Sequence, residues 1–261
     1  MRIMIVPKKI VTRVIFALCI ALVCAAYVRM WLPEDRAAAA LAPVAASKPL
    51  PVYNVGRDDN KIAISFDAAW GDEKTDEILH ILKERNITTS FFLVGYWVDA
   101  YPEDVRKIHA AGHEIGNHSA THPHMSKLSK GQIVEELQKC SDKVEATTGV
   151  PTTLFRPPYG DYNSLVVETS REQGYEIVQW DVDSLDWKNY GIQPMVDQVM
   201  KKVKSGSVIL FHNNSEYITQ ALPIILDKLL EQGYEIVPVS TLLLEGETVI
   251  DHAGCQHKAV Q

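Results

Sequence analysis

Two histidines four positions apart, His118 and His122, are the first residues of this sequence whose type and spacing suggest chemistry. One helical turn would place both imidazoles on the same face, where a divalent cation could take two nitrogen ligands. Histidine pairs with this spacing also occur by coincidence on protein surfaces. The pair therefore predicts a metal site only if other polar residues gather around it.

Other residues are unusual for their surroundings. Arg156 precedes two prolines and is either a surface loop charge or a fixed guanidinium that holds a carboxylate, with Asp186 as the expected partner. His212 ends the apolar run 207–211, so it is either a packed core histidine or a general acid that titrates near neutral pH. Trp187 follows an acid and suits either simple packing or the wall of a pocket.

The elements that must position these residues alternate between strand and helix patterns. Buried-strand patterns are expected at 62–66, 88–94, 113–117, 153–156, 175–181, 207–212 and 234–239. Helical patterns are expected at 75–85, 102–111, 131–147, 163–173, 194–203 and 217–231. Such alternation, with mostly buried strands, favours an α/β fold built on a parallel sheet.

A four-residue sequence pattern recurs at Gly112, Gly174 and Gly233. Each time it is expected to mark the end of a helix and the beginning of a strand. Glycine suits the end of a helix because it adopts the left-handed conformation at little cost. The spacing fits two β/α units per recurrence, and residues 55–245 are somewhat few for a complete eight-fold barrel. We therefore expect an incomplete seven-stranded (β/α) barrel. An open doubly wound sheet is the alternative, although no glycine-rich phosphate loop follows the first strand.

In both architectures the reactive residues lie at the carboxyl ends of the strands. The polar residues of this sequence fall there. Asp67 ends the first expected strand, and the polar segments 117–122, 156–160, 181–187 and 212–214 follow the third to the sixth strands. Five strand ends that converge on one mouth predict a single functional site.

These segments contain motifs whose order resembles the polysaccharide deacetylases of carbohydrate esterase family 4, the NodB-homology domain. The resemblance covers about residues 58–243. Its five motifs are Ser65-Phe66-Asp67, His118-Ser119-Ala120-Thr121-His122, Arg156-Pro157-Pro158-Tyr159-Gly160, Asp183-Ser184-Leu185-Asp186-Trp187 and Leu210-Phe211-His212. The Phe-Asp-Ala-Ala-Trp-Gly sequence that starts at Phe66 is similar to a membrane-anchored branch of spore-forming bacteria that is linked to sporulation.

The resemblance implies a barrel of the NodB type and metal-dependent removal of N-acetyl groups from an amino-sugar polymer, either peptidoglycan or a chitin-like glycan. The implied metal is a divalent cation, expected to be zinc, with cobalt, nickel or manganese as alternatives. His118 and His122 match its two histidine ligands. A metal of this kind polarises the amide carbonyl and lowers the pKa of its bound water.

The resemblance also implies roles for the other matching residues. Asp67 would take a proton from water as the general base, and His212 would protonate the leaving amine. The backbone N–H of Tyr159 would stabilise the oxyanion together with the metal. Arg156 and Asp186 would set the charges around the acid and the base. Trp187 and Leu210 would line the pocket for the acetyl methyl group.

One position departs from the family motif, which carries two adjacent acids, the second of which binds the metal. Here Asp67 is followed by Ala68. Asp72 follows Gly71, which lets the chain turn, so Asp72 could return a carboxylate to the metal. It could instead cap the helix that begins near Glu73, or water could fill the site. Two functions stay open: an active metal-dependent deacetylase, and a glycan-binding protein of the same fold that has lost turnover.

The N-terminal segment predicts export. Basic residues at positions 2, 8, 9 and 13 precede the apolar run 14–28, which indicates a signal peptide or membrane anchor within 1–30. Residues 31–54 are expected to be a linker, 55–245 the deacetylase domain and 246–261 a tail. The net charge of −7 combines a basic N-terminal segment, +5 over residues 1–50, with a body at −12, and the acidic body argues against nucleic-acid binding. The expected partners are the membrane, through the N-terminal segment, and a cell-wall glycan outside the cytoplasm.

Overall fold

The computed structural model describes residues 48–259. The predicted signal peptide or anchor at 1–30, and the linker up to residue 47, lie outside the described residues. Within 48–259, no helix is both long enough and apolar enough to cross a membrane. Contacts group Lys48–Gln261 into one compact unit.

The elements of this unit are as follows. The main sheet contains β2 (Lys61–Ala68), β3 (Ser90–Leu93), β4 (Glu114–Asn117), β5 (Leu154–Phe155), β6 (Glu176–Ile177), β7 (Val182–Asp183), β8 (Val208–His212) and β9 (Glu235–Ile236). A small second sheet contains β1 (Asn54–Val55), β10 (Thr248–Ile250) and β11 (Cys255–Lys258). The α-helices are α3 (Thr75–Glu84), α4 (Gly95–Ala100), α5 (Pro102–Ala110), α6 (Lys130–Thr148), α7 (Ser164–Glu172), α8 (Ile192–Lys202), α9 (Ile218–Glu231) and α10 (Val239–Leu242). Three short 3₁₀ helices are η1 (Met125–Lys127), η2 (Pro158–Gly160) and η3 (Asp186–Lys188).

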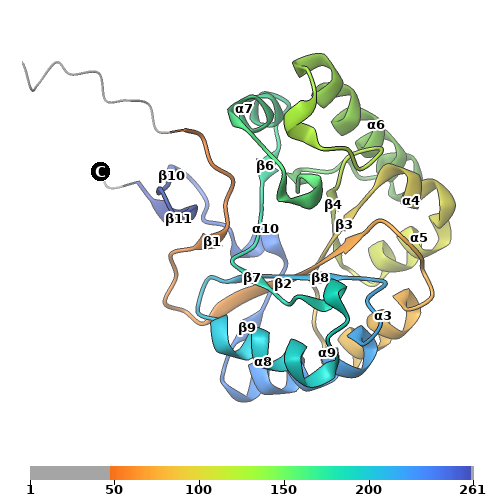
Figure 1. The fold of residues 1–261 in the computed structure, drawn as a ribbon, viewed down its shortest axis with the longest axis vertical. Helices are drawn as coiled ribbons and strands as arrows, with labels where there is room; N and C mark the ends of the chain where they lie inside the picture. Colours follow the sequence, from red (N-terminus) through yellow and green to blue (C-terminus); the bar gives the residue numbers. More distant parts are fainter. Residues whose placement is uncertain (1–47, 260–261) are drawn as a thin grey trace, which may run out of the picture. The chain divides into compact units, whose positions relative to one another are not determined.

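The main sheet curls into most of a barrel. Its strands follow the order β6-β5-β4-β3-β2-β8-β7, and β9 pairs with the start of β2. All of these pairings are parallel. Figure 1 shows the sheet at the centre, with helices α3 to α9 around it. The predicted α/β fold, an incomplete seven-stranded (β/α) barrel, is confirmed.

The expected strand 175–181 divides into two at a bend. Its first part, β6, pairs with β5, whereas β7 pairs with β8. Val52 pairs with the chain between β6 and β7. Its N–H donates to the carbonyl of Ile177, and its carbonyl accepts the N–H of Gln179. Val52 is fully buried. The end of the predicted linker, residues 48–54, therefore belongs to the folded body.

The predicted tail 246–261 also contributes strands. β10 and β11 form an antiparallel hairpin, and β11 pairs in parallel with β1. The side chain of Gln256 in β11 is buried and accepts the N–H of Leu244. The domain thus extends at both ends beyond the predicted 55–245. Apolar periodicity did not mark β10 and β11, because their side chains are largely polar and partly exposed.

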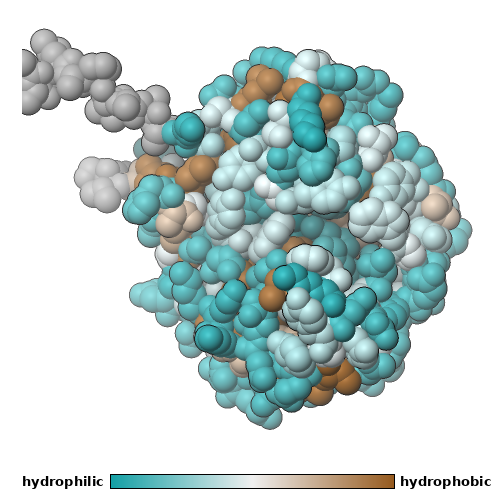
Figure 2. Space-filling model, in the orientation of Figure 1, coloured by the Kyte–Doolittle hydropathy of each residue, from teal (hydrophilic) through white to brown (hydrophobic). Residues whose placement is uncertain are grey.

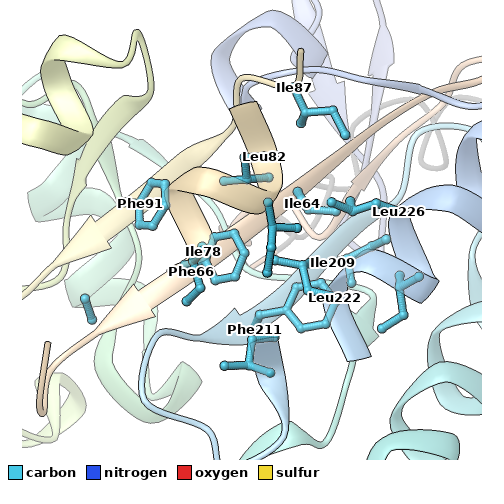
Figure 3. Close-up of a cluster of buried hydrophobic side chains, with 14 of the residues drawn as sticks. Ile64, Phe66, Ile78, Leu82, Ile87, Phe91, Ile209, Phe211, Leu222 and Leu226 are labelled. Atoms are coloured by element: carbon cyan, nitrogen blue, oxygen red, sulfur yellow. The ribbon is translucent and has the colours of Figure 1, made fainter. Parts of the chain in front are cut away.

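The main core lies between the sheet and helices α3 and α9. Figure 3 shows the side chains that meet there: Ile64 and Phe66 of β2, Ile209 and Phe211 of β8, Ile78 and Leu82 of α3, and Leu222 and Leu226 of α9. Successive side chains of a strand alternate between its two faces. Because the even-numbered residues of β2 fill this core, Ser65 and Asp67 lie on its other face. The outer surface in Figure 2 is mostly hydrophilic, with apolar residues in small separate groups.

Local signals fix the helix ends. Ser129 and Gln132 form a reciprocal capping box at the start of α6. The three recurring glycines, Gly112, Gly174 and Gly233, all have positive φ, as the sequence predicts. Helix α4 was not predicted, because its six residues are too short to show a helical period.

Acidification is expected to destabilise the fold through His113. This side chain is buried, and its Nδ1 accepts the N–H of Thr89 at 3.1 Å, which requires the neutral ring. Burial lowers the pKa of His113 to about 4 from the ordinary value of 6.5. The unfolded chain therefore binds this proton first as pH falls. Its stabilising contribution is complete above pH 6.5 and is lost between pH 6.5 and 4, by up to about 3 kcal/mol.

Denaturant unfolding of the wild type and His113→Asn at pH 7 and pH 4 measures this effect. The substitution removes the titration but leaves every other histidine in place. The stability difference between the two proteins should shrink as pH falls. A difference that stays constant over this range would show that His113 does not titrate as its burial requires.

Candidate active site

The carboxyl ends of the parallel strands open into one cavity of about 540 Å³. The register brings these ends level, because Asp67 of β2 lies directly opposite His212 of β8. Ala68, the next residue of β2, lies opposite Leu93 of β3. The cavity is lined by Asp67, Ala69, Trp70, His118, His122, Tyr159, Trp180, Asp183, Trp187, Asn189, Leu210, His212, Asn214 and Ser215.

Asp67 is a buried carboxylate held by a buried guanidinium. The Nη1 of Arg156 donates to its Oδ1 at 2.7 Å, and Arg156 itself has no exposed surface. Burial alone would raise the pKa of Asp67, but the charge and the hydrogen bond of Arg156 outweigh burial and lower it. Asp67 is thus an anion at neutral pH. The expected pairing of Arg156 with Asp186 is wrong, because Asp67 takes that place.

His118 has a fixed ring orientation. Its side chain is almost fully buried, and its Nδ1 lies 2.7 Å from the carbonyl oxygen of Arg156, to which it can only donate. The lone pair is therefore on Nε2, which lies 3.5 Å from Oδ2 of Asp67. Burial lowers the pKa of His118, so the ring is neutral near pH 7. A neutral ring oriented by a carbonyl is the usual state of a metal-binding histidine.

His122 meets His118 through a loop. Ring centroids of the two are 5.0 Å apart. The expected helical turn is wrong, since Ser119 and His122 both have positive φ and the segment is not helical. Asn117 and Ser119 support the loop: the Asn117 side chain accepts the N–H of Ser119, whose hydroxyl accepts the N–H of His122. Burial lowers the pKa of His122 to about 4.

Strained backbone gathers around the cavity. Seven non-glycine residues of the described part have positive φ, and five of them lie in the loops at this mouth: Ser119, His122, Tyr159, Leu185 and Asn189. Each such residue costs on the order of 1–3 kcal/mol and is kept only where the surrounding structure imposes it. This clustering is typical of a functional site.

The two imidazoles fit a divalent cation in part. Both are neutral, His118 is oriented, and Nδ1 of His122 is buried without a hydrogen-bond partner. Ala68, however, offers no donor where the family motif carries its metal-binding acid. Across residues 48–259, His118 and His122 form no set of three ligand atoms within 4.8 Å of one another with a third His, Cys, Asp or Glu. Two nitrogen ligands are therefore in place, and the anionic one is missing.

Asp72 does not replace it. Burial, followed by the neighbouring carboxyl group of Asp104, raises the pKa of Asp72. The residue does not line the cavity. The capping alternative is also wrong, because α3 has Lys74 at its N-cap position and no side-chain cap, and Asp72 accepts the Thr75 N–H only through its backbone carbonyl.

His212, on the strand next to that of Asp67, forms a second pair with Asp186. Nδ1 of His212 donates to Oδ1 of Asp186 at 2.8 Å, and the N–H of His212 donates to Oδ2 at 2.7 Å. Burial lowers the pKa of His212, but the hydrogen bond and charge of Asp186 outweigh it and raise the pKa. The raised pKa favours the protonated ring, and His212 can reach a ligand because it is partly exposed and lines the cavity.

Aromatic side chains surround the opening. Trp70, Tyr159 and Trp187 are each more than half exposed, and all three line the cavity. Tyr159 also packs edge-on against His122, with centroids 4.4 Å apart. Leu210 lies in the cavity wall and is buried. The predicted substrate-binding residues Tyr159, Trp187 and Leu210 therefore share one cavity with the predicted base and acid.

Several lining residues were not singled out from the sequence: Trp70, Trp180, Asn189 and Ser215. The sequence could have indicated Trp70 as a cavity residue, because it follows the first motif by three residues. Trp180, Asn189 and Ser215 lie in bends whose direction depends on where β7 and η3 turn. No local pattern encodes that direction.

The family follows from comparison with known proteins. A peptidoglycan-N-acetylglucosamine deacetylase of Bacillus cereus is 35% identical over 196 residues, which cover 73% of this chain and 92% of that protein. The sequence model described as polysaccharide deacetylase matches residues 54–178. This chain belongs to the polysaccharide deacetylase family. It spans 62% of YlxY and 38% of the N-acetylmuramic acid deacetylase PdaC, both curated relatives from Bacillus subtilis.

Solved structures of this family include a protein described as a pseudoenzyme. A CE4 family pseudoenzyme from Bacillus anthracis is 34% identical, with a TM-score of 0.72 over 74% of this chain and 69% of that one. A mutant of the same pseudoenzyme, 35% identical with the same TM-score over 74% and 71% of the two chains, is described as having restored enzymatic activity. Membership in the polysaccharide deacetylase family thus includes both active enzymes and pseudoenzymes.

Replacing Arg156 with leucine is expected to destabilise this deacetylase fold by about 3–5 kcal/mol, because it leaves the buried Asp67 carboxylate unpaired. Chemical denaturation measures the loss. The matched control is Arg85→Leu, which breaks the ion pair with the exposed Asp227 and should cost about 0–1 kcal/mol. Equal losses in the two variants would contradict the paired, buried state of Asp67.

Proposed function

We propose that this protein removes N-acetyl groups from the amino sugars of peptidoglycan. The observation that carries the proposal is the register of β2 and β8, which places Asp67 directly opposite His212 in one cavity. Hydrolysis of an amide needs both a base for the attacking water and an acid for the leaving amine. The pKa of each group is shifted toward the required state.

Asp67 is the base in this proposal. Its Oδ1 is occupied by Arg156, so Oδ2 is the oxygen that takes a proton from water. Arg156 keeps the carboxylate ionised in a buried position where it would otherwise be neutral. The guanidinium carbon of Arg156 lies 4.0 Å from the centroid of the Phe92 ring, so the guanidinium is itself held in place. It therefore also fixes the position of the Asp67 carboxylate.

His212 is the acid. Asp186 fixes its ring through Nδ1, which leaves the Nε2 proton for the amine as the C–N bond breaks. The Asp186 carboxylate is itself held by the backbone N–H groups of Trp187 and His212. The proton therefore comes from a ring whose orientation and charge are set before substrate binds.

His118 and His122 would hold the divalent metal, for which we propose zinc. When bound, it would polarise the acetyl carbonyl and supply an acidic water. The side chains of Trp187 and Leu210 provide apolar surface for the acetyl methyl group. The exposed rings of Trp70 and Tyr159 extend the cavity toward a longer glycan.

The second candidate is a glycan-binding protein without turnover. Ala68 favours it, because the family's anionic metal ligand is missing and zinc affinity should be low. The description of the Bacillus anthracis relative as a pseudoenzyme also supports it. Both candidates share the cavity and the glycan, and they differ in whether the bound acetyl group is released.

We further propose that the body works outside the cytoplasmic membrane, during sporulation. The basic and apolar residues within 1–30 support export, and the Phe-Asp-Ala-Ala-Trp-Gly motif supports the sporulation branch. Protease added to intact protoplasts should digest the body. Full protection of the body would contradict the orientation.

Peptidoglycan analysis tests the activity. Purified peptidoglycan is treated with the full-length protein and zinc, digested with a muramidase, and analysed by mass spectrometry. The proposal predicts muropeptides that lack an acetyl group after treatment with the wild type and none after treatment with Asp67→Asn. Glycan that binds the wild type but keeps every acetyl group would establish the second candidate instead.

A further inference from the structure

The C-terminal hairpin brings together three side chains that bind metals. The ligand atoms of Asp251, Cys255 and His257 all lie within 4.8 Å of one another. They come from the turn between β10 and β11 and from β11 itself, in the small sheet beside β1 (Figure 1). Cys255 and His257 are two residues apart on one strand, so their side chains share a face.

The carboxylate of Asp251 is already fixed in place. Its Oδ1 accepts the backbone N–H groups of Ala253 and Cys255, both at 2.9 Å. Its Oδ2 is left over and lies 3.2 Å from Nε2 of His257. The turn thus uses one carboxylate oxygen for its own backbone and directs the other toward the imidazole.

The position of His257 depends on its neighbour across the sheet. An added Cβ at Gly56 would lie 2.6 Å from Nδ1 of His257, so a larger residue there would displace the ring. Gly56 follows β1 directly, and its N–H donates to the carbonyl of Gln256. The imidazole therefore contacts the start of the body on one side, while 45% of its side chain stays exposed to a ligand.

We propose that Asp251, Cys255 and His257 form a second divalent-metal site, of the zinc class, separate from the catalytic cavity. A thiolate, an imidazole and a carboxylate are the three ligand types that zinc uses, and water would complete the tetrahedron. Binding converts the Cys255 thiol to a thiolate and releases its proton to solvent. The hard cations calcium and magnesium prefer oxygen ligands and would bind poorly here.

A metal at this site would hold the tail to the beginning of the folded body. β11 pairs with β1, and the hairpin is otherwise joined by few apolar contacts, since most of its side chains are polar. Residues 48–53 lead directly into β1. The metal would thus stabilise the pairing between the first and the last strand of the described domain. This inference is independent of whether the protein is an active deacetylase.

Cobalt substitution tests the site, because thiolate ligation to cobalt(II) gives a charge-transfer band that imidazole and carboxylate ligands do not. The full-length wild type titrated with cobalt should show this band. The double variant His118→Ala/His122→Ala should keep it, and Cys255→Ser should lose it. A wild type without the band, or a band that survives in Cys255→Ser, would overturn the site.

A second measurement uses only the wild type. Alkylation of Cys255, followed by mass spectrometry of its peptide, should slow when zinc is present and should be unchanged by calcium. The fully buried Cys140 serves as an internal reference for global opening of the fold. Equal labelling of Cys255 with and without zinc would also contradict the proposal.

Discussion

Replacing Ala68 with aspartate should tighten zinc binding at least about tenfold. Residues that only hydrogen-bond to a metal's ligands already change metal affinity by about 10–100-fold, so a direct ligand should contribute at least the lower of these values. The substitution restores the acid that the family motif carries directly after Asp67, and the two neutral imidazoles supply the nitrogen ligands. Ala68 is fully buried, so the new carboxylate should destabilise the metal-free protein. Zinc should then raise the melting temperature of Ala68→Asp more than that of the wild type, because the metal binds only the folded state.

Isothermal titration with zinc measures the affinity directly. Cys255→Ser is used as the background in every variant, so that the hairpin does not contribute. Asp72→Ala is the matched control, since Asp72 interacts with Asp104 rather than with the cavity, and its affinity should equal that of the background. If Ala68→Asp binds zinc no better, the first motif has been assigned wrongly. A mutant of a pseudoenzyme of this family is described as having restored enzymatic activity.

Replacing His212 with alanine should lower kcat by about 10²–10⁴, the usual contribution of a general acid. Zinc affinity should stay unchanged, because the donors of His118 and His122 remain. The rate is measured as acetate release, in the Ala68→Asp background if the wild-type rate is too low to follow. His80→Ala, on the exposed face of α3, is the control and should keep full activity. Unchanged turnover of His212→Ala would remove His212 from the mechanism.

Much of the fold was predictable because its signals are local. The alternation of strands and helices, and the three glycines that end helices, needed only short windows of sequence. Helix α4 and the hairpin of β10 and β11 were missed, since the first is too short for a period and the second buries little apolar surface. Val52 was assigned to a linker because one apolar residue in an extended segment carries no period.

The site was predictable in its members and less so in its pairings. Asp67, His118 and His212 fall at strand ends, so the sheet itself brings them together. The partner of Arg156 could not be deduced, because the choice between Asp67 and Asp186 depends on how the strands curl. The loop that joins His118 to His122, and the direction in which Asp72 points, depend likewise on tertiary contacts rather than on spacing.

Acetate release by the zinc-loaded wild type from N-acetylglucosamine oligomers tests the central claim most directly, with Asp67→Asn as the reference. The base and acid, placed next to each other on neighbouring strands of the cavity, predict slow but measurable release by the wild type, a higher rate in Ala68→Asp, and none in Asp67→Asn. Two results would contradict the account. In the first, the wild type and Asp67→Asn release acetate at the same rate. In the second, neither the wild type nor Ala68→Asp releases any acetate.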